Sequence, residues 1–308
     1  MSHDPVISQG VAATPAMGKC EYSEAPPVLS IVVPVYRDWM RFADLMDCIE
    51  AQHGAPPPFE VIAVNNDPER APALEGRETV RIVDCVQPGS YPARNAGAAV
   101  AQGDWLVFTD ADCLPEAGWL ANLLTAIGDR HADLLAGPVD VFAGACPNRW
   151  EIYDVLRGIP QARYVDHGYA ATANLAVRAD LFRKLGGFDP ARRSGGDADF
   201  CRRARAGGAR LVLVKNARVR HPARNSRDDT MDKARRIKGG QIGAGTARRR
   251  AYWLARTLVP PVHEMARYLV APQPLRYRFT ALAVRAEIWG VELAEAVRLI
   301  AGGAPQRR

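Results

Sequence analysis

The sequence lacks most of the features that mark secreted, zinc-binding or membrane-spanning proteins. Its 308 residues contain no Cys-x-x-Cys pair, and no uninterrupted apolar run approaches the roughly 18 residues of a membrane-spanning helix. The first five residues lack the basic and apolar regions of a secretory signal. We therefore expect a cytoplasmic protein. The cysteines are scattered, which suits a reducing compartment and argues against a disulfide scaffold: Cys20, Cys48, Cys85, Cys113, Cys146 and Cys201.

Acidic residues are scarce in the last third of the chain. Residues 1–199 hold 16 Lys and Arg against 27 Asp and Glu, whereas residues 200–250 hold 16 against 3 and residues 251–308 hold 8 against 4. Hydrophobic residues make up 48% of the chain, which is enough for a packed core. The basic surplus is thus confined to the C-terminal third, where it favours an anionic partner or surface.

Strand-like and helix-like segments alternate along most of the chain. Residues 29–36 are too continuously apolar for a sheet with one solvated face, so a mostly parallel α/β sheet covered by helices on both faces is expected. The chain divides into a flexible tail at 1–27, an α/β domain at 28–224 and a basic, amphipathic helical extension at 225–308. Further strands are expected at 59–64, 81–86 and 104–108, and helices at 39–52, 93–101, 116–127, 251–271 and 278–301.

Two aspartates follow the apolar strand 104–108. Asp110 and Asp112 are spaced by one residue, so in a continuing strand their side chains point the same way. Carboxylates held this close repel each other unless a cation lies between them, and hard divalent ions such as Mg²⁺ or Mn²⁺ prefer such ligands. A solvated turn is the alternative interpretation, because aspartate is common in turns.

Three polar segments follow predicted parallel strands, at 34–38, 65–67 and 110–112. In open α/β sheets, ligands bind beyond the carboxyl ends of the strands, so we expect these segments to meet in one crevice. Three polar strand ends that include a carboxylate pair are typical of a nucleotide-diphosphate site.

Residues 28–224 resemble the family-2 glycosyltransferases of the GT-A fold, a Rossmann-like sheet sandwiched by helices. That resemblance implies transfer of a sugar, with inversion, from a nucleotide-diphosphate donor (a UDP-sugar in the first instance) to a saccharide or lipid-linked acceptor, as in the synthesis of cell-envelope polysaccharides, with Mg²⁺ or Mn²⁺ as cofactor. The matching motifs, in the family's order, are Ser30–Tyr36, Ala93–Gly97, Phe108–Asp112, Ala173–Asn174, Gly186–Asp189, Gly195–Asp197 and His221.

The resemblance implies that the nucleoside lies along the first two strand ends. Pro34, Tyr36 and Asp38 belong to the loop expected to contact it, with Tyr36 stacking on the base or contacting it. A turn proline beside a core tyrosine is the alternative for Pro34 and Tyr36. Asn65 stands where the family usually has an aspartate that accepts the uracil N3–H. An amide oxygen can accept the same bond without charge assistance, and Asp67 is the alternative contact.

The resemblance also implies the phosphate, sugar and metal contacts. Arg94 and Asn95 open a helix next to the expected diphosphate, where an arginine suits a phosphate, although a surface ion pair is the alternative for Arg94. Asn174 would bind a sugar or serve as a buried turn amide. By the same resemblance Asp110 contacts the ribose or the metal and Asp112 coordinates the metal. His221 would join them or play a structural role.

Asp197 is the expected catalytic base. The family's usual pattern here is Glu-Asp, in which the Asp takes a proton from the acceptor hydroxyl; Gly196 replaces the Glu, and Asp197 matches the Asp. The alternative role for Asp197 is a helix N-cap, which aspartate also favours. Asp199 is the competing candidate for the base.

The Asp-x-Asp motif and the basic segment also allow two other functional interpretations. A haloacid-dehalogenase-type phosphatase also carries Asp-x-Asp after a strand, but it expects Thr or Val where Leu114 stands. A nucleic-acid-binding role for the basic residues 200–250 leaves the acidic crevice unexplained, so no nucleic-acid partner is expected.

The basic segment at 224–250 would close over the diphosphate or lie on an anionic membrane surface, with the protein peripheral on the inner face of the membrane. The helices after it would lie in the membrane interface or pack on the α/β domain. No Gln-x-x-Arg-Trp motif of processive synthases occurs, which argues against a polymerase.

Overall fold

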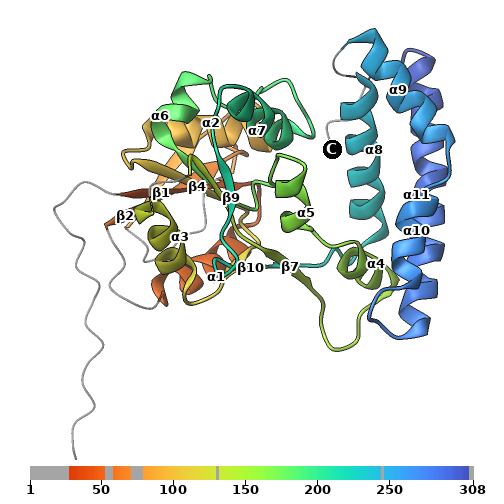
Figure 1. The fold of residues 1–308 in the computed structure, drawn as a ribbon, viewed down its shortest axis with the longest axis horizontal. Coiled ribbons are helices and arrows are strands. Elements are labelled where there is room, and N and C mark those ends of the chain that lie inside the picture. Colours follow the sequence, from red (N-terminus) through yellow and green to blue (C-terminus); the bar gives the residue numbers. More distant parts are fainter. Residues whose placement is uncertain (1–27, 53–57, 71–78, 130–131, 244–245, 305–308) are drawn as a thin grey trace, which may run out of the picture.

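The computed structural model describes residues 28–52, 58–70, 79–129, 132–243 and 246–304 (Figure 1). The predicted tail at 1–27 lies outside the described residues. Within them the chain forms a mixed α/β body followed by a group of long helices. The predicted fold class is confirmed.

The central sheet has seven strands, four of whose six neighbouring pairs are parallel. β8 runs antiparallel to both of its neighbours, β4 and β6. The strands, in spatial order, are β3 (Val80–Asp84), β2 (Phe59–Asn65), β1 (Leu29–Val35), β4 (Trp105–Thr109), β8 (Asn174–Arg178), β6 (Leu134–Ala136) and β9 (Leu211–Leu213).

The continuous apolar run of β1 is explained by burial on both faces. Ile31 and Val33 belong to one hydrophobic cluster, with α1 (Trp39–Glu50) and α3 (Trp119–Gly128). Val32 belongs to a second cluster on the opposite face, since successive side chains of a strand alternate. That second face is covered by α2 (Ser90–Val100), α6 (Ala179–Lys184) and α7 (Gly196–Ala206).

A small second sheet lies beside the central one. Its strands, in spatial order, are β5 (Leu114–Pro115), β10 (Val219–Pro222) and β7 (Val139–Phe142). β10 runs antiparallel to β5 and parallel to β7. Because β5 occupies residues 114–115, α3 begins at Trp119 rather than at the predicted residue 116. The pairing of β10 with β5 brings His221 back beside the segment that follows β4.

The helical extension packs on itself and on α4 (Arg149–Arg157). Tyr153 of α4, Met231 and Tyr268 share a buried cluster with Val284. The predicted single helix at 251–271 is wrong, since Pro260 and Pro261, which lack backbone N–H groups, separate two helices. None of the described helices is long and apolar enough to cross a membrane. The remaining helices are α5 (Gln161–Asp166), α8 (Arg227–Gly243), α9 (Ala247–Leu258), α10 (Val262–Leu269) and α11 (Leu275–Ile300).

Candidate active site

The two aspartates after β4 lie close together. Asp110, Asp112 and Cys113 each offer one ligand atom, and the three atoms lie within 4.8 Å of one another. Burial raises the pKa of Asp112, and the nearby Asp110 raises it further, whereas His221 lowers it. Two carboxylates in a partly buried position favour a bound cation, which would relieve their repulsion.

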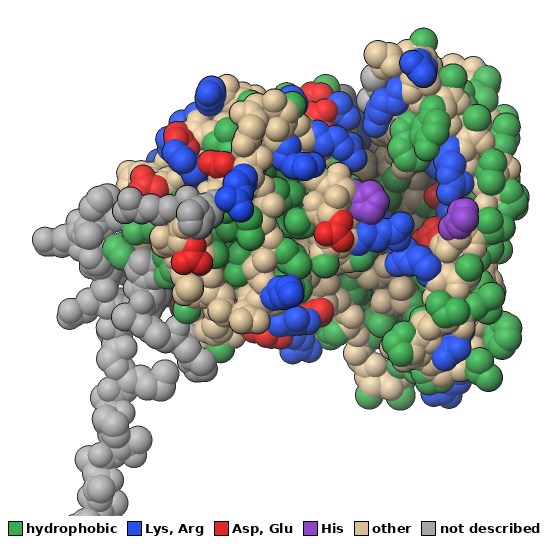
Figure 2. All heavy atoms as spheres, in the orientation of Figure 1, with side chains coloured by type: hydrophobic (Ala, Val, Ile, Leu, Met, Phe, Trp, Pro, Cys, Tyr) green, Lys and Arg blue, Asp and Glu red, His purple; other side chains and the backbone are tan. Residues whose placement is uncertain are grey.

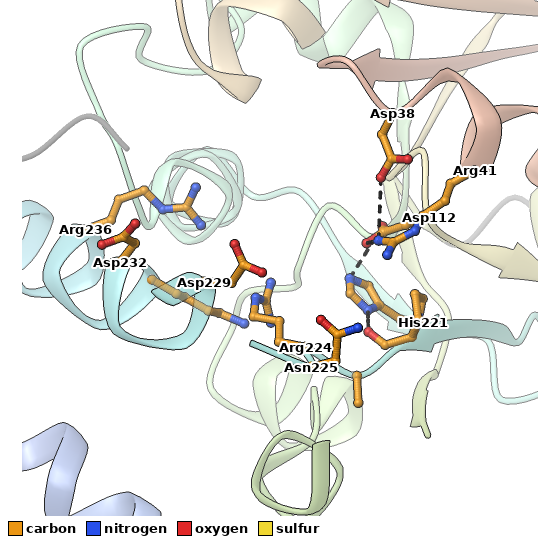
Figure 3. A pocket seen from close by; sticks show the side chains of 12 residues that line it. Asp38, Arg41, Asp112, His221, Arg224, Asn225, Asp229, Asp232 and Arg236 are labelled. Atoms are coloured by element: carbon orange, nitrogen blue, oxygen red, sulfur yellow. Dashed lines mark hydrogen bonds and ion pairs between the residues drawn. The ribbon is translucent and has the colours of Figure 1, made fainter. Parts of the chain in front are cut away.

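His221 completes this acidic corner (Figure 3). Its Nδ1 lies 2.7 Å from the carbonyl oxygen of Pro222, which can only accept a hydrogen bond, so Nδ1 carries a proton. Its Nε2 then faces Asp112 Oδ1 at 3.6 Å. In neutral histidine that nitrogen presents a lone pair to a carboxylate, an arrangement that fits a shared divalent cation.

Cys113 fits such an ion poorly. Burial raises the pKa of its thiol well above the ordinary value, and the neighbouring aspartates add to this shift. The sulfur lies 3.8 Å from the carbonyl oxygen of Ala173, to which the thiol can donate. Hard divalent ions prefer oxygen ligands to a neutral thiol, so Asp110, Asp112 and His221 are the better ligand set.

Arg94 lies beneath the acidic corner and forms an ion pair with Asp110. Its side chain is buried, and its guanidinium lies 6.0 Å from the centre of the Tyr91 ring. The expected surface ion pair is thus a buried one. The positive charge at the start of α2 balances Asp110, while the expected phosphate contact remains a prediction.

Asp197 lies in the first turn of α7, not at its N-cap, which is Gly195. Its Oδ1 accepts hydrogen bonds from the backbone N–H of Ala198 at 2.8 Å and from the Tyr91 hydroxyl at 3.3 Å. Burial raises the pKa of Asp197, although Ala198, Arg94 and Tyr91 oppose the shift. A raised pKa makes this carboxylate a better proton acceptor.

Asp199 is bound on both sides by arginines. Arg192 lies 2.7 Å from its Oδ1 and Arg203 lies 3.1 Å from its Oδ2. Both carboxylate oxygens of Asp199 are therefore engaged by guanidinium groups. The surroundings therefore favour Asp197 over Asp199.

The ends of β1 and β2 meet at the expected nucleoside side. The Asn65 amide donates to Asp84 Oδ1 at 2.9 Å, and its oxygen accepts from the backbone N–H of Asp67 at 3.2 Å. Asp67 in turn pairs with Arg37 at 2.5 Å. Tyr36, with 36% of its surface exposed, has the Arg37 guanidinium 4.8 Å from its ring centre. Asn65 is thus used to shape the loop that presents Asp67.

Pro34 and Asp38, the other two residues expected to contact the nucleoside, precede and follow Tyr36 in the chain. Pro34 is within β1, opposite Val64 of β2, and is half-buried. Asp38 precedes α1, lies 3.5 Å from Arg41, and lines the pocket shown in Figure 3.

Two asparagines expected at the site have hydrogen-bond partners within the fold. The Asn95 amide donates to the Phe188 carbonyl at 2.7 Å and accepts from the Phe188 N–H at 3.0 Å. Asn174 is buried; its oxygen accepts from the Trp119 indole at 3.0 Å and its nitrogen donates to the Ala217 carbonyl at 2.8 Å. Asn174 is therefore a buried amide with partners inside the fold, and its expected contact with a sugar remains a prediction.

Two pockets lie next to these residues, of about 450 Å³ and about 520 Å³. The first is lined by Asp112 and His221 on one side and by α8 on the other (Figure 3). The second is lined by Tyr36 and Tyr91. Arg236 of α8 borders both, so the basic helix faces the predicted donor site.

Two contributions to the site escaped the sequence analysis. Arg41 lies 3.7 Å from Asp112, and Tyr91 links α2 to Asp197. Lys233 belongs to the basic segment that was expected near the diphosphate, and it lines the first pocket from α8. The basic surplus of residues 200–250 was the signal for Lys233, whereas nothing local to Arg41 or Tyr91 indicates the partner that the fold brings to it.

The family model described as glycosyl transferase family 2 matches residues 30–186. The chain belongs to this family. Glycosyltransferase activity follows from membership, and the phosphatase and nucleic-acid interpretations are set aside. Because the match ends at residue 186, the family model leaves the helical extension outside it.

Glycosyltransferases are also found among individual proteins similar to this family-2 chain. Glycosyltransferase AglE of Haloferax volcanii is 28% identical over 224 residues, which cover 70% of this chain and 73% of the relative. A pre-mycofactocin glycosyltransferase of Mycobacterium tuberculosis is 34% identical over 149 residues, 46% of this chain. That match spans only 32% of the mycobacterial protein.

A solved structure shares the fold of this family-2 chain. It is the mannosyltransferase PcManGT from Pyrobaculum calidifontis in complex with GDP-Man and Mn²⁺. The two structures match with a TM-score of 0.56 and 17% identity, covering 90% of this chain and 88% of that one. The similarity therefore reaches beyond the segment matched by the family model and includes helices of the extension.

Proposed function

We propose that this family-2 glycosyltransferase is an inverting, metal-dependent enzyme that takes a sugar from a UDP-sugar or related nucleotide-diphosphate donor. The observation that carries the proposal is the corner formed by Asp110, Asp112 and the Nε2 of His221, at the carboxyl end of β4. A divalent cation, Mg²⁺ or Mn²⁺, would supply stabilisation of the negative charge on the leaving diphosphate. The complex of PcManGT with Mn²⁺ supports this cofactor.

Asp197 is the proposed base. An inverting transfer needs one group that removes the acceptor proton as the hydroxyl attacks. The Tyr91 hydroxyl and the Ala198 N–H orient the carboxylate, and its partial burial keeps its pKa raised. Arg94 forms its ion pair with Asp110 and acts on Asp197 only through its charge.

The nucleoside is proposed to lie in the second pocket. Tyr36 presents a partly exposed ring there, and aromatic rings bind bases by stacking. Asp67, presented by Asn65, is the proposed polar contact to the base. The acceptor is proposed to be a saccharide or a lipid-linked saccharide, in cell-envelope polysaccharide synthesis.

Attachment to the inner face of a membrane is proposed for the helical extension. The extension exposes apolar side chains, among them Leu258 at 70%, Val270 at 80% and Phe279 at 60%. Figure 2 shows hydrophobic side chains gathered along the outer edge, over α9, α10 and α11. Such a face suits helices that lie in a membrane interface.

Donor binding tests the function. Binding of UDP-, GDP- and dTDP-sugars to the full chain should be measured by calorimetry, with and without Mn²⁺, for wild type and Asp112→Asn. We expect tight binding only with the ion, a preference for UDP-sugars, and a loss of about tenfold or more in the variant, since coordination needs the charged carboxylate. Equal affinity with excess chelator would remove the metal from the proposal.

A further inference from the structure

The first pocket has a second wall, opposite the proposed metal ligands. Asp112 and His221 form one side, and residues of α8 with the preceding Arg224 form the other (Figure 3). Lys233 and Arg224 line both this pocket and a smaller cavity of about 120 Å³ between α4, α8 and α11. The wall thus lies where the catalytic body meets the helical extension.

The acidic residues of this wall are already engaged. Asp229 Oδ2 accepts a hydrogen bond from the Ser226 hydroxyl at 2.6 Å, and the Asp229 backbone N–H donates to Ser226 Oγ at 3.0 Å. Asp232 pairs with Arg235 at 2.8 Å. Neither carboxylate therefore serves as the counter-ion of Lys233.

Lys233 itself is surrounded by positive charge. Its ammonium makes no hydrogen bond or ion pair with any residue in the described ranges, while Arg157 and Arg224 lie close enough to disfavour its charged form. Burial and these two arginines hold the pKa of Lys233 well below its ordinary value. Like charges gathered in a partly buried place favour an anion that can bind between them.

Asp154 is the acid nearest to this cluster, and it is already shared. Its Oδ2 accepts from Arg224 twice, from the backbone N–H and from Nη1, each at 3.1 Å, and Arg157 lies 3.9 Å from Oδ1. One buried carboxylate therefore faces two guanidinium groups and one ammonium. The cluster keeps a positive surplus beside an open pocket.

We propose that Lys233 and Arg224, with Arg157 in the adjoining smaller cavity, form a binding site for a phosphate group, across the first pocket from Asp112 and His221. Guanidinium groups offer paired N–H donors that match phosphate oxygens, and a lysine adds a mobile charge. Resting on the proposed function, the phosphate belongs to a substrate of the transfer: either a phosphate-linked acceptor or the diphosphate of the donor. The first source would make the acceptor an anionic, phosphate-bearing molecule.

Inorganic phosphate is the probe for the site itself. Its binding to the full chain should be measured by calorimetry at low ionic strength, for wild type, Lys233→Gln and the control Lys215→Gln. Lys215 is exposed outside the pocket, so the control removes the same charge elsewhere. We expect the affinity to fall about tenfold or more in Lys233→Gln only, with no loss of melting temperature, because the substitution relieves repulsion. Equal phosphate affinity in Lys233→Gln and wild type would overturn the proposal, whether or not the variant melts earlier.

Saturation with UDP and Mn²⁺ separates the two sources. If phosphate still binds to the saturated protein, and Lys233→Gln removes that binding, the site serves the acceptor. If UDP displaces phosphate, and Lys233→Gln weakens UDP binding by a similar factor, the site serves the donor diphosphate. Donor binding through Asp112 is measured separately with Asp112→Asn. If this variant loses metal-dependent donor binding but still binds phosphate, the result does not contradict the phosphate site.

Discussion

Asp197 and Asp199 are two residues apart in one turn of α7, yet their surroundings are opposite. Asp199 is held by Arg192 and Arg203, while Asp197 accepts from a tyrosine hydroxyl and a backbone N–H. Sequence alone places both carboxylates near the helix start. The Asp199–Arg203 pair is a local contact four residues apart, whereas only the fold brings Tyr91 to Asp197, which is 106 residues away.

Asp197→Asn should reduce sugar transfer by roughly 100-fold or more while leaving donor affinity nearly unchanged, since a general base contributes about this much. Transfer is followed as release of nucleoside diphosphate, and donor affinity by calorimetry. Asp199→Asn is the matched control and should lose far less activity. Comparable losses in the two variants would argue against Asp197 as the base.

The pH dependence of Asp197 follows from the direction of its shift. Burial raises the pKa of Asp197 in the folded state. Ionisation of Asp197 therefore lowers the stability of the fold once the pH exceeds the pKa of the unfolded state, and the loss is complete above the pKa of the folded state. At pH 7, Asp197→Asn should therefore melt no earlier than wild type. Transfer should increase as the pH rises through the raised pKa, because only the carboxylate accepts a proton. A lower melting temperature for the variant at pH 7 would assign Asp197 a structural role.

The predicted site residues differ in how the fold uses their side chains. Asp110, Asp112 and His221 were predicted from motifs and lie together in the structure. Asn95 and Asn174 were taken from similar motifs, but their hydrogen-bond partners lie 93 and 55 residues away. An amide both donates and accepts, so its role depends on partners that only the tertiary structure supplies.

At the scale of elements, the buried strands were the most predictable part of the fold. The continuous apolar run of β1 requires cover on both faces, and the structure provides it through two separate clusters. Boundaries were less predictable. α2 begins at Ser90 rather than residue 93, because Pro92 is tolerated in the first turn, where no N–H donor is needed.

Gly97 fixes the approach of α2 to the sheet. A Cβ atom there would lie 2.5 Å from Val32 Cγ1 and 2.8 Å from Val64 Cγ2, both in buried and stiff side chains. Gly97→Ala should destabilise the protein by about 1–3 kcal/mol, the usual effect of overpacking, although alanine favours helices. Urea unfolding measures the change.

Gly290→Ala is the control for this prediction. Gly290 is in α11, and nothing lies within 4 Å of the position that its Cβ would take. The better helix propensity of alanine should then stabilise the protein by up to about 1 kcal/mol. If both variants were stabilised, α2 would lie farther from β1 and β2 than the structure has it.

At the scale of the whole molecule, acidic residues of the extension turn toward other helices. Glu264 pairs with Arg285 at 2.7 Å, and Glu292 lies 3.2 Å from the same arginine. Arg256 and Arg267 are exposed, as are the apolar side chains near them. Amphipathic periodicity in the sequence indicated helices here, but it could not show which side would remain uncovered, because α4 and α8 supply the inner partners.

This distribution predicts salt-sensitive binding to anionic membranes. Vesicles of phosphatidylcholine with phosphatidylglycerol should carry the protein in flotation at low salt and lose it at high salt, because ions screen the exposed arginines. Leu258→Ser combined with Val270→Ser should weaken binding by roughly tenfold or more, since each apolar side chain contributes about 1.5–3 kcal/mol when fully buried. The control combines Met40→Ser with Val86→Ser, which are 82% and 83% exposed but lie on the α/β body. Equal flotation with neutral vesicles, or equal losses in the two double variants, would assign the apolar face to another partner.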